Sequence, residues 1–282
     1  MKSVEEGRPI EFVLPSFPVK CFNPLKVRRR EPDLAEVASL SRLYSLCREI
    51  ARIYSPGARF MLVLDGLVYA PIFREPLQYS REYKNKLIEM VCKMRISSYI
   101  HISDMSGLVN SLKEEFKNVS ERVKEDITKY WKSESFSSEV NGLINNTMTN
   151  INLMNYSESS LLEAFNYPSE SPVRSEIEEI AKKSAFEYLV FNQTIKEISL
   201  LERYFPEALR VTCHPKEGQI GLHLVHPKSF NFPWNGVGIM KKDGTVRVEF
   251  EHEARRDPNY IPVYIKGQNH PFYFQELRNY KY

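Results

Sequence analysis

Three titratable residues stand where the sequence predicts that a strand or a turn ends, and side chains at such positions often carry function. Lys26 closes the segment CFNPLK, Asp65 follows the apolar run FMLVL, and His214 follows the run LRVTC. A lysine and a histidine at strand ends can bind phosphate or transfer protons, and histidine titrates near neutral pH. Asp65 precedes Gly66, and an Asp-Gly pair is more often a structural turn than a reactive site. Together the three residues indicate acid–base or phosphate chemistry without defining the reaction.

Several common catalytic and ligand-binding motifs are absent from the sequence. It contains no G-x-G-x-x-G or G-x-x-x-x-G-K-[ST] loop, no H-E-x-x-H and no G-x-S-x-G. His223 and His226 make a weak metal pair, because an odd spacing on a strand puts two side chains on opposite faces. The basic run Arg28–Arg30 is either a phosphate-binding patch or the solvated face of a loop.

The composition predicts a folded protein with nearly balanced charge. Hydrophobic residues make up 42% of the 282, and the 39 Lys and Arg exceed the 36 Asp and Glu by only three. This balance argues against a dedicated nucleic-acid-binding protein and leaves contact through Arg28–Arg30 as a minor alternative. No apolar run is long enough to span a membrane, and the N-terminus has no apolar leader. The four widely spaced cysteines predict neither disulfides nor a zinc site, so we expect a cytoplasmic protein.

Apolar periodicity predicts alternating helices and strands over the first half of the chain. Residues 33–54 carry apolar side chains at three- and four-residue steps between Pro32-Asp33 and Pro56-Gly57, which indicates an amphipathic helix. Segment 17–30 is expected to be a strand followed by a turn, and Asp65-Gly66 is expected to be a turn. The other elements expected here are strands at 60–64 and 96–102 and helices at 79–94 and 108–131.

The composition and the apolar pattern of the second half of the chain change twice. The Ser- and Asn-rich stretch 134–171 predicts loose helices, within a helical insertion over about 100–170 that could form a lobe or lid. Residues 174–205 predict one long helix, stopped by Pro206. From Leu209 onward, short apolar runs separated by turn signals predict antiparallel hairpins that complete a sheet begun by the earlier strands. The expected fold class is α/β, with a mixed sheet flanked by helices and a β-rich C-terminal third, in a single domain 1–282.

Taken in order, these segments resemble the isocyanide (isonitrile) synthase family, also called the dityrosine/pyoverdine biosynthesis family. The similarity covers roughly residues 17–100 and 174–276, and it is most specific in the N-terminal half. The matching words are CFNPLK at 21–26, PDLAE at 32–36, LCREIARIYSPGA at 46–58, LDG at 64–66, FPEALRVTCHP at 205–215, FPWNG at 232–236 and NHPFYF at 269–274.

The resemblance implies a Rossmann-like fold and a defined reaction. In that reaction the amino group of tyrosine or tryptophan condenses with ribulose 5-phosphate, whose C2 becomes the carbon of an isocyanide or of its N-formyl derivative. The resemblance implies no metal and no organic cofactor. It suggests a downstream oxygenase of the same pathway as a partner, and neither nucleic acid nor membrane.

The resemblance also assigns roles to individual residues. Lys26 would be a phosphate ligand or an acid–base group, His214 a proton shuttle, and Asp65 the catalytic carboxylate that holds the substrate ammonium or sugar hydroxyls. Arg210 would hold a carboxylate or phosphate. The other residues expected to bind substrate are Asn23, Lys182 (or its neighbour Lys183), Lys216, Trp234 and Asn235.

Two departures from the family pattern keep alternatives open. The family has T-P-W-H where this chain has FPWN, so Asn235 replaces a histidine and cannot transfer a proton at neutral pH. An Arg-Ser pair of the family is replaced near Asn192. Besides the standard reaction, the sequence is therefore compatible with a divergent carbon–nitrogen reaction. It is also compatible with a non-catalytic protein that binds a sugar phosphate or an amino acid.

Overall fold

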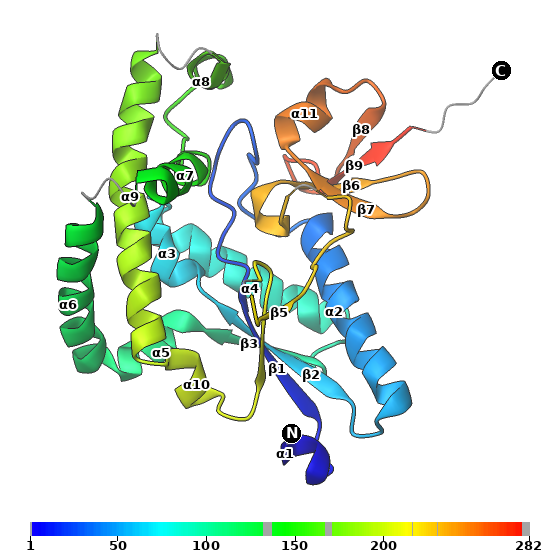
Figure 1. Ribbon diagram of the computed structural model, residues 1–282. Helices are drawn as coiled ribbons and strands as arrows, with labels where there is room; N and C mark the ends of the chain where they lie inside the picture. Colours follow the sequence, from blue (N-terminus) through cyan, green and yellow to red (C-terminus); the bar gives the residue numbers. More distant parts are fainter. Residues whose placement is uncertain (1, 132–136, 167–170, 216, 230, 278–282) are drawn as a thin grey trace.

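The structure, a computed structural model, describes residues 2–131, 137–166, 171–215, 217–229 and 231–277. Its centre is a five-stranded sheet in the order β3-β2-β1-β4-β5, and all four strand pairs are parallel (Figure 1). The strands are β1 (Ile10–Ser16), β2 (Ala58–Leu64), β3 (Ile100–Asp104), β4 (Leu209–Thr212) and β5 (Ile220–Gly221). A parallel sheet of this kind is covered by helices on both faces, which explains the nearly continuous apolar runs of its strands.

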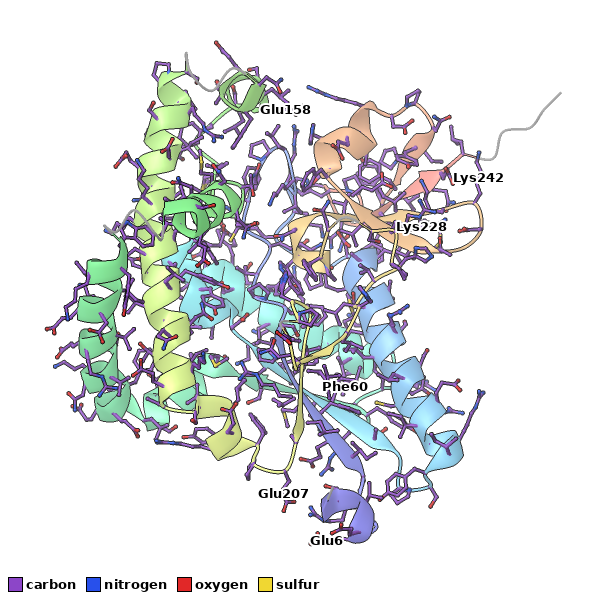
Figure 2. All side chains as sticks on the ribbon, in the orientation of Figure 1. Glu6, Phe60, Glu158, Glu207, Lys228 and Lys242 are labelled. Atoms are coloured by element: carbon purple, nitrogen blue, oxygen red, sulfur yellow. The ribbon has the colours of Figure 1, made fainter. Side chains whose placement is uncertain are left out.

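Alternate side chains of the strands contact two different helical layers. Leu14 and Leu62 face α2 (Leu34–Ile53) and α4 (Leu77–Lys93), whereas Val13 and Val63 face α5 (Met105–Ser111) and α10 (Leu200–Tyr204). Phe60 of β2 belongs to the first of these cores, between the sheet and α2 (Figure 2). The sheet is therefore doubly wound, as the predicted Rossmann-like fold requires.

The predicted helix at 33–54 is confirmed as α2, and its start is fixed by a capping box. The Asp33 carboxylate accepts a hydrogen bond from the Ala35 amide, and the Glu36 carboxylate accepts one from the Asp33 amide, each at 2.7 Å. Both carboxylates satisfy amide groups that the first helical turn leaves without a partner.

Four strands after residue 236 form a second, mixed sheet and do not complete the first one, so that prediction is wrong for this region. They are β6 (Val237–Met240), β7 (Val246–Glu249), β8 (Tyr260–Val263) and β9 (Tyr273–Glu276), in the order β7-β6-β9-β8, with α11 (Glu251–Arg256) beside them. The second sheet rests on the start of α2. A Cβ on Gly238 would lie 2.8 Å from the Ala35 amide nitrogen, so only glycine allows this close approach.

The remaining helices lie on the other side of the molecule (Figure 1). Ile144, Leu161 and Ile177 share one apolar core, which holds α7 (Ser137–Met148) and α8 (Glu158–Asn166) against α9 (Pro172–Glu197). The long helix predicted at 174–205 is interrupted, because Ser199 adopts a left-handed conformation with φ 49° between α9 and α10.

Three further boundaries differ from the sequence prediction. The helix predicted at 108–131 is divided at Leu112 into α5 and α6 (Lys113–Trp131). The helical insertion starts after residue 104, because residues 100–104 form β3 inside the central sheet. Segment 17–30 contains no strand: β1 precedes it, and the segment is a loop pinned by one bridge between Asn23 and Val27. The smaller elements are α1 (Lys2–Glu5), α3 (Gly66–Ile72) and the 3-10 helix η2 (Pro233–Asn235).

Asp65-Gly66 begins helix α3 and does not form the predicted turn. A Cβ on Gly66 would lie 1.5 Å from the Pro18 carbonyl oxygen, so glycine is required where the β2 exit crosses the loop after β1. No helix in the described ranges has the length and apolar character needed to cross a membrane.

Candidate active site

A cavity of about 580 Å³ opens at the carboxyl edge of the central sheet. Its walls include the exits of four strands, through Ser16, Asp65, Met105 and Thr212. The strand order reverses at β1, with β2 on one side and β4 on the other. Open parallel sheets bind their ligands at this kind of switch point, outside the carboxyl ends of the strands.

Six of the nine site residues predicted from the sequence line this one cavity, although they are far apart in the chain. They are Lys26, Asp65, Arg210, His214, Trp234 and Asn235.

Lys26 is buried in the cavity wall without a carboxylate partner among the described residues. Its ammonium group donates a hydrogen bond of 2.8 Å to the Asn150 side-chain oxygen and lies 5.6 Å from the centre of the Phe250 ring. The side chain is 8% exposed. Burial lowers the pKa of Lys26 from 10.5 to about 8, because removal from water disfavours the charged amine. A sizeable neutral fraction is therefore present at physiological pH.

Asp65 shows the opposite response to the same cause. Burial raises the pKa of its carboxyl group to about 7, and no cation in the described residues offsets that burial. Its Oδ1 atom is buried and has no hydrogen-bond partner within the described part of the chain. A buried carboxylate oxygen without a partner at the wall of a cavity is available to a ligand, and a pKa near 7 suits proton transfer.

His214 lies on the exposed part of the cavity wall, next to an aromatic pair. Its ring is 4.4 Å from the ring of Phe232, which stacks on Trp234 at 5.1 Å. Partial burial lowers the pKa of His214 below its ordinary value, so the ring is largely neutral near pH 7 and can accept a proton. Arg210, on β4, lines the cavity with a half-exposed side chain and pairs with Glu202 at 3.1 Å.

Asn235 is held in place by a fully buried ion cluster. The Lys20 ammonium group donates to the carbonyl oxygen of Gly236 at 3.2 Å, and it pairs with Asp33 at 2.7 Å and Glu36 at 3.1 Å. Burial alone would lower the pKa of Lys20, but the two carboxylates raise it above the ordinary value. This cluster connects the start of α2 to η2 and so fixes the segment that carries Asn235.

The other three predicted residues do not line the cavity. Asn23 is a structural residue: its side chain accepts from the Leu25 amide and donates to the Thr149 carbonyl. Lys182 is 41% exposed on α9 and pairs with acidic residues of its own helix, so its proposed contact with substrate is not supported by its position. Lys216 lies outside the described residues.

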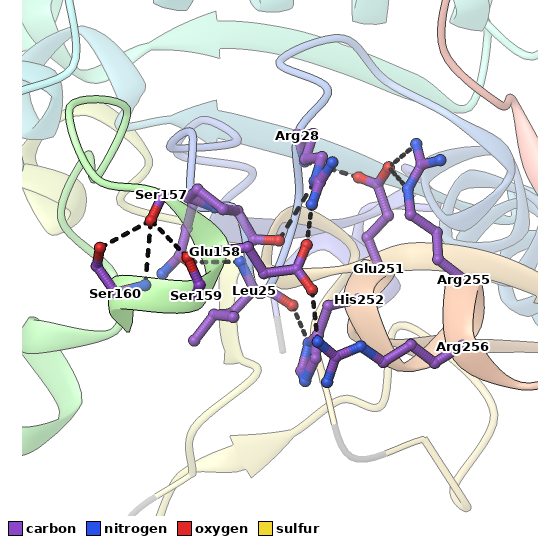
Figure 3. Close-up of polar contacts among 12 residues, drawn as sticks. Leu25, Arg28, Ser157, Glu158, Ser159, Ser160, Glu251, His252, Arg255 and Arg256 are labelled. Atoms are coloured by element: carbon purple, nitrogen blue, oxygen red, sulfur yellow. Dashed lines mark hydrogen bonds and ion pairs between the residues drawn. The ribbon is translucent and has the colours of Figure 1, made fainter. Parts of the chain in front are cut away.

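Neither interpretation of the basic run Arg28–Arg30 fits, because each arginine is paired with a glutamate. Arg28 contacts Glu158 of α8, which also pairs with Arg256 of α11 at 2.9 Å (Figure 3). Arg30 contacts the buried Glu75. The run therefore ties the loop after β1 to the helical layer and to the second sheet, around the cavity.

Sequence reasoning missed the residues that the helices contribute to the cavity. Tyr69 and Tyr188 line it with ring centres 5.3 Å apart, and the Tyr69 hydroxyl donates to the Asn192 side-chain oxygen at 2.8 Å. Asn150, the partner of Lys26, follows α7 in a stretch that the sequence marked only as rich in Asn. Tyr188 and Asn192 are four residues apart, and this spacing could have placed both on one face of α9.

Comparison with known proteins places this arrangement in a family. A sequence model described as "Pyoverdine/dityrosine biosynthesis protein" matches residues 1–261. The chain belongs to this family. The match runs through residues 100–170, which the motifs alone left uncovered.

Named relatives of the chain are enzymes. An L-tyrosine isonitrile synthase of Xenorhabdus nematophila is 28% identical over 83% of this chain and 69% of its own length. An L-tyrosine isonitrile synthase of Pseudomonas aeruginosa is also 28% identical, over 85% of this chain and 72% of its own length. An L-tryptophan isonitrile synthase of Fischerella ambigua is 25% identical over 96% of this chain and 79% of its own length.

The fold of the chain is also that of a solved family member. The crystal structure of the PvcA protein from Pseudomonas aeruginosa superposes with a TM-score of 0.77 at 24% identity, and it covers 98% of this chain and 88% of the other. The predicted Rossmann-like α/β fold is thereby confirmed, with the second sheet as an addition to it.

Proposed function

We propose that this chain is an isonitrile synthase that joins the amino group of tyrosine or tryptophan to ribulose 5-phosphate, with C2 of the sugar becoming the isocyanide carbon. One observation carries the proposal: Lys26 and Asp65 line one cavity at the switch point of the sheet, and neither has an ion-pair partner in the part of the chain that the structure describes. The names of the relatives supply the type of reaction.

The cavity suits two small substrates with different chemical character. Its volume lies inside the range of roughly 300–1,000 Å³ that is usual for small-molecule sites. The rings of Tyr69, Phe73 and Tyr188 form an apolar wall near Asp65, which suits an aromatic amino acid with its ammonium group toward the carboxylate. Arg210 also lines the cavity and suits the sugar phosphate, because a phosphate can replace its exposed partner Glu202.

The proposed reaction needs several proton transfers. The ammonium group must lose a proton before it attacks the C2 carbonyl carbon, and the Asp65 carboxylate can accept that proton because its pKa is near 7. Loss of water from the adduct then needs an acid. Removal of a proton from the carbon next to the imine needs a base, and neutral His214 fills that role. The sequence-based roles of Asp65 and His214 thus remain proposals with matching pKa directions.

A second candidate function is binding without turnover, and Asn235 is the observation that favours it. Asn235 lines the cavity where the family pattern has a histidine, and an amide cannot supply a proton. The same substitution is also compatible with a divergent carbon–nitrogen reaction. In that reaction His214 alone would supply the proton transfers.

The test is mass spectrometry of the full chain with ribulose 5-phosphate and each proteinogenic amino acid in turn. The proposal predicts a product equal to tyrosine or tryptophan plus one carbon and minus two hydrogens. Lys182→Met on the outer face of α9 should leave the yield unchanged, whereas Asp65→Asn should lower it. Binding of the sugar phosphate without consumption of any amino acid would reject the synthase and favour the binding protein.

A further inference from the structure

Two lysines are buried among the residues that the structure describes, and they have opposite surroundings. Lys20 contacts two carboxylates and has no exposed surface. Lys26 lines the cavity and contacts one neutral amide oxygen and one aromatic ring. A lysine held among neutral groups is a nucleophile, whereas a lysine between carboxylates is a fixed charge.

We propose that Lys26 forms a covalent imine with the keto carbon of the sugar phosphate before the amino acid reacts. The inference rests on the proposed function and deepens it, because it makes Lys26 a nucleophile and not a phosphate ligand.

The covalent step balances without any co-reactant. The neutral amine of Lys26 adds to C2 of the ketose, and loss of one water with uptake of one proton from the solvent gives a protonated imine between Nζ and C2. The amino group of the amino acid then adds to that carbon, and Nζ leaves as the free amine. The sugar carbon ends in an imine with the amino acid, and Lys26 is regenerated.

The surroundings of Lys26 fit nucleophilic attack. With a pKa of about 8, roughly a tenth of the amine is neutral at pH 7, against about one in three thousand for an ordinary lysine. Asn150 orients Nζ through its side-chain oxygen without supplying a negative charge. The Phe250 ring excludes water from one side, while the cavity leaves another side open to a ligand. A protonated imine is also a better electrophile than a ketone, so the amino acid gains a faster reaction partner.

A phosphate ligand would call for a different environment. A guanidinium group binds phosphate through two parallel hydrogen bonds, and Arg210 on the same cavity wall can provide them. Burial of Lys26 disfavours its protonated form, and this opposes a role as an anion ligand.

The test is reductive trapping in the full chain. The protein is incubated with ribulose 5-phosphate and cyanoborohydride, which reduces imines faster than ketones, without amino acid. We expect one adduct, located on Lys26 by peptide mass spectrometry and equal to the sugar phosphate less one oxygen. Tyrosine or tryptophan added in excess should suppress the adduct, since transfer to the amino acid frees Lys26. Lys20 serves as the internal control and should carry no adduct.

Variants separate the imine from a phosphate contact. Lys26→Arg keeps a cation but cannot form the imine, so turnover should fall at least about 100-fold while the KM for ribulose 5-phosphate changes little. Lys182→Met should leave both trapping and turnover unchanged. Each variant is first compared with the wild type in thermal melting.

The outcomes distinguish this inference from the proposed function. Product formation by the wild type with no adduct on Lys26, or retained turnover in Lys26→Arg, overturns the imine and leaves the synthase intact. An adduct on Lys26 in a protein that converts no amino acid supports the imine and overturns the synthase. Adducts spread over exposed lysines in place of Lys26 reject the imine.

Discussion

The loop after β1 contributes one lysine to each of two buried groups of charged residues, and these groups differ in whether their charges are paired. Lys20, Asp33 and Glu36 form a closed cluster at the start of α2, and the Tyr83 hydroxyl donates to Glu36 at 3.0 Å. Lys26 and Asp65 line the cavity without any ion-pair partner among the described residues. The first group holds elements together, and the second titrates close to neutral pH.

The difference shows how one physical cause gives two outcomes. Both groups are removed from water, which disfavours charge in each. In the paired cluster, carboxylates raise the pKa of Lys20 despite its burial. In the cavity no ion-pair partner among the described residues opposes burial, so the pKa of Lys26 falls to about 8 and that of Asp65 rises to about 7. Unpaired buried charge therefore marks the reactive site more clearly than burial does.

Breaking the paired cluster should have the largest effect. Lys20→Met leaves two carboxylates buried without their cation, and removal of one partner of such a cluster costs about 3–5 kcal/mol. Thermal and urea unfolding should show this loss at pH 7. A loss below about 1 kcal/mol would show that the cluster is not the structural anchor described here.

Removing Lys26 should lower turnover without destabilising the fold. Lys26→Met is expected to lower turnover by about 10²- to 10⁴-fold. The folded pKa of Lys26 lies below its unfolded value, so its charge destabilises the fold fully below pH 8 and not at all above the unfolded pKa. The variant should therefore be more stable than the wild type at pH 7, by about 1–3 kcal/mol, with the gain vanishing near pH 11. Equal destabilisation in Lys20→Met and Lys26→Met would contradict the comparison.

Asp65→Asn should also stabilise the fold, but at high pH and not at low pH. Its effect on turnover should be smaller, a loss of about 10²-fold. The folded pKa of Asp65 lies above its unfolded value, so the carboxylate destabilises the fold increasingly as the pH rises from about 4 through 7. The variant should gain about 1–3 kcal/mol at pH 8 and nothing at pH 3, as measured by denaturant unfolding across pH. A gain that does not depend on pH would mean that the Asp65 carboxyl group does not titrate in this range.

The smallest effect is expected at the departure from the family pattern. Asn235→His restores the family residue on the cavity wall, and the backbone there is already fixed by Lys20 through Gly236. We expect wild-type turnover or higher, measured as initial rate with the best amino acid. A large loss would show that Asn235 makes a contact that the histidine cannot replace.

Much of the fold could be predicted from local patterns. The periodicity and capping residues of α2 and the apolar run of β2 define these elements without tertiary contacts. Two features could not be predicted this way. A pattern of short strands after Leu209 does not tell which sheet each strand joins, and the separate second sheet depends on Gly238 meeting the start of α2. The divided helices depend on single positions such as Ser199.

The cavity was predictable at the strands and not at the helices. Asp65 and His214 follow apolar runs that are strands of the parallel sheet and end at one edge. Lys26 reaches the cavity from the loop after β1, where the sequence wrongly predicted a strand. On α9 the face toward the cavity carries Tyr188 and Asn192, and it continues through Ala185 and Ala181 toward the N-terminus. Lys182 is one position off this face, and a shift of one residue rotates a side chain by about 100° around a helix. Composition alone cannot resolve that rotation.

We propose above that this cavity builds an isocyanide carbon from the ketose. The most direct measurement uses ribulose 5-phosphate carrying carbon-13 at C2, with tyrosine or tryptophan, and follows the label by carbon NMR and mass spectrometry. The account predicts that the label appears in the isocyanide carbon of the wild-type product, and that Lys26→Arg and Asp65→Asn lose this signal while Lys182→Met keeps it. An unlabelled product, or label that stays in the sugar phosphate after all amino acids have been tried, would contradict the account.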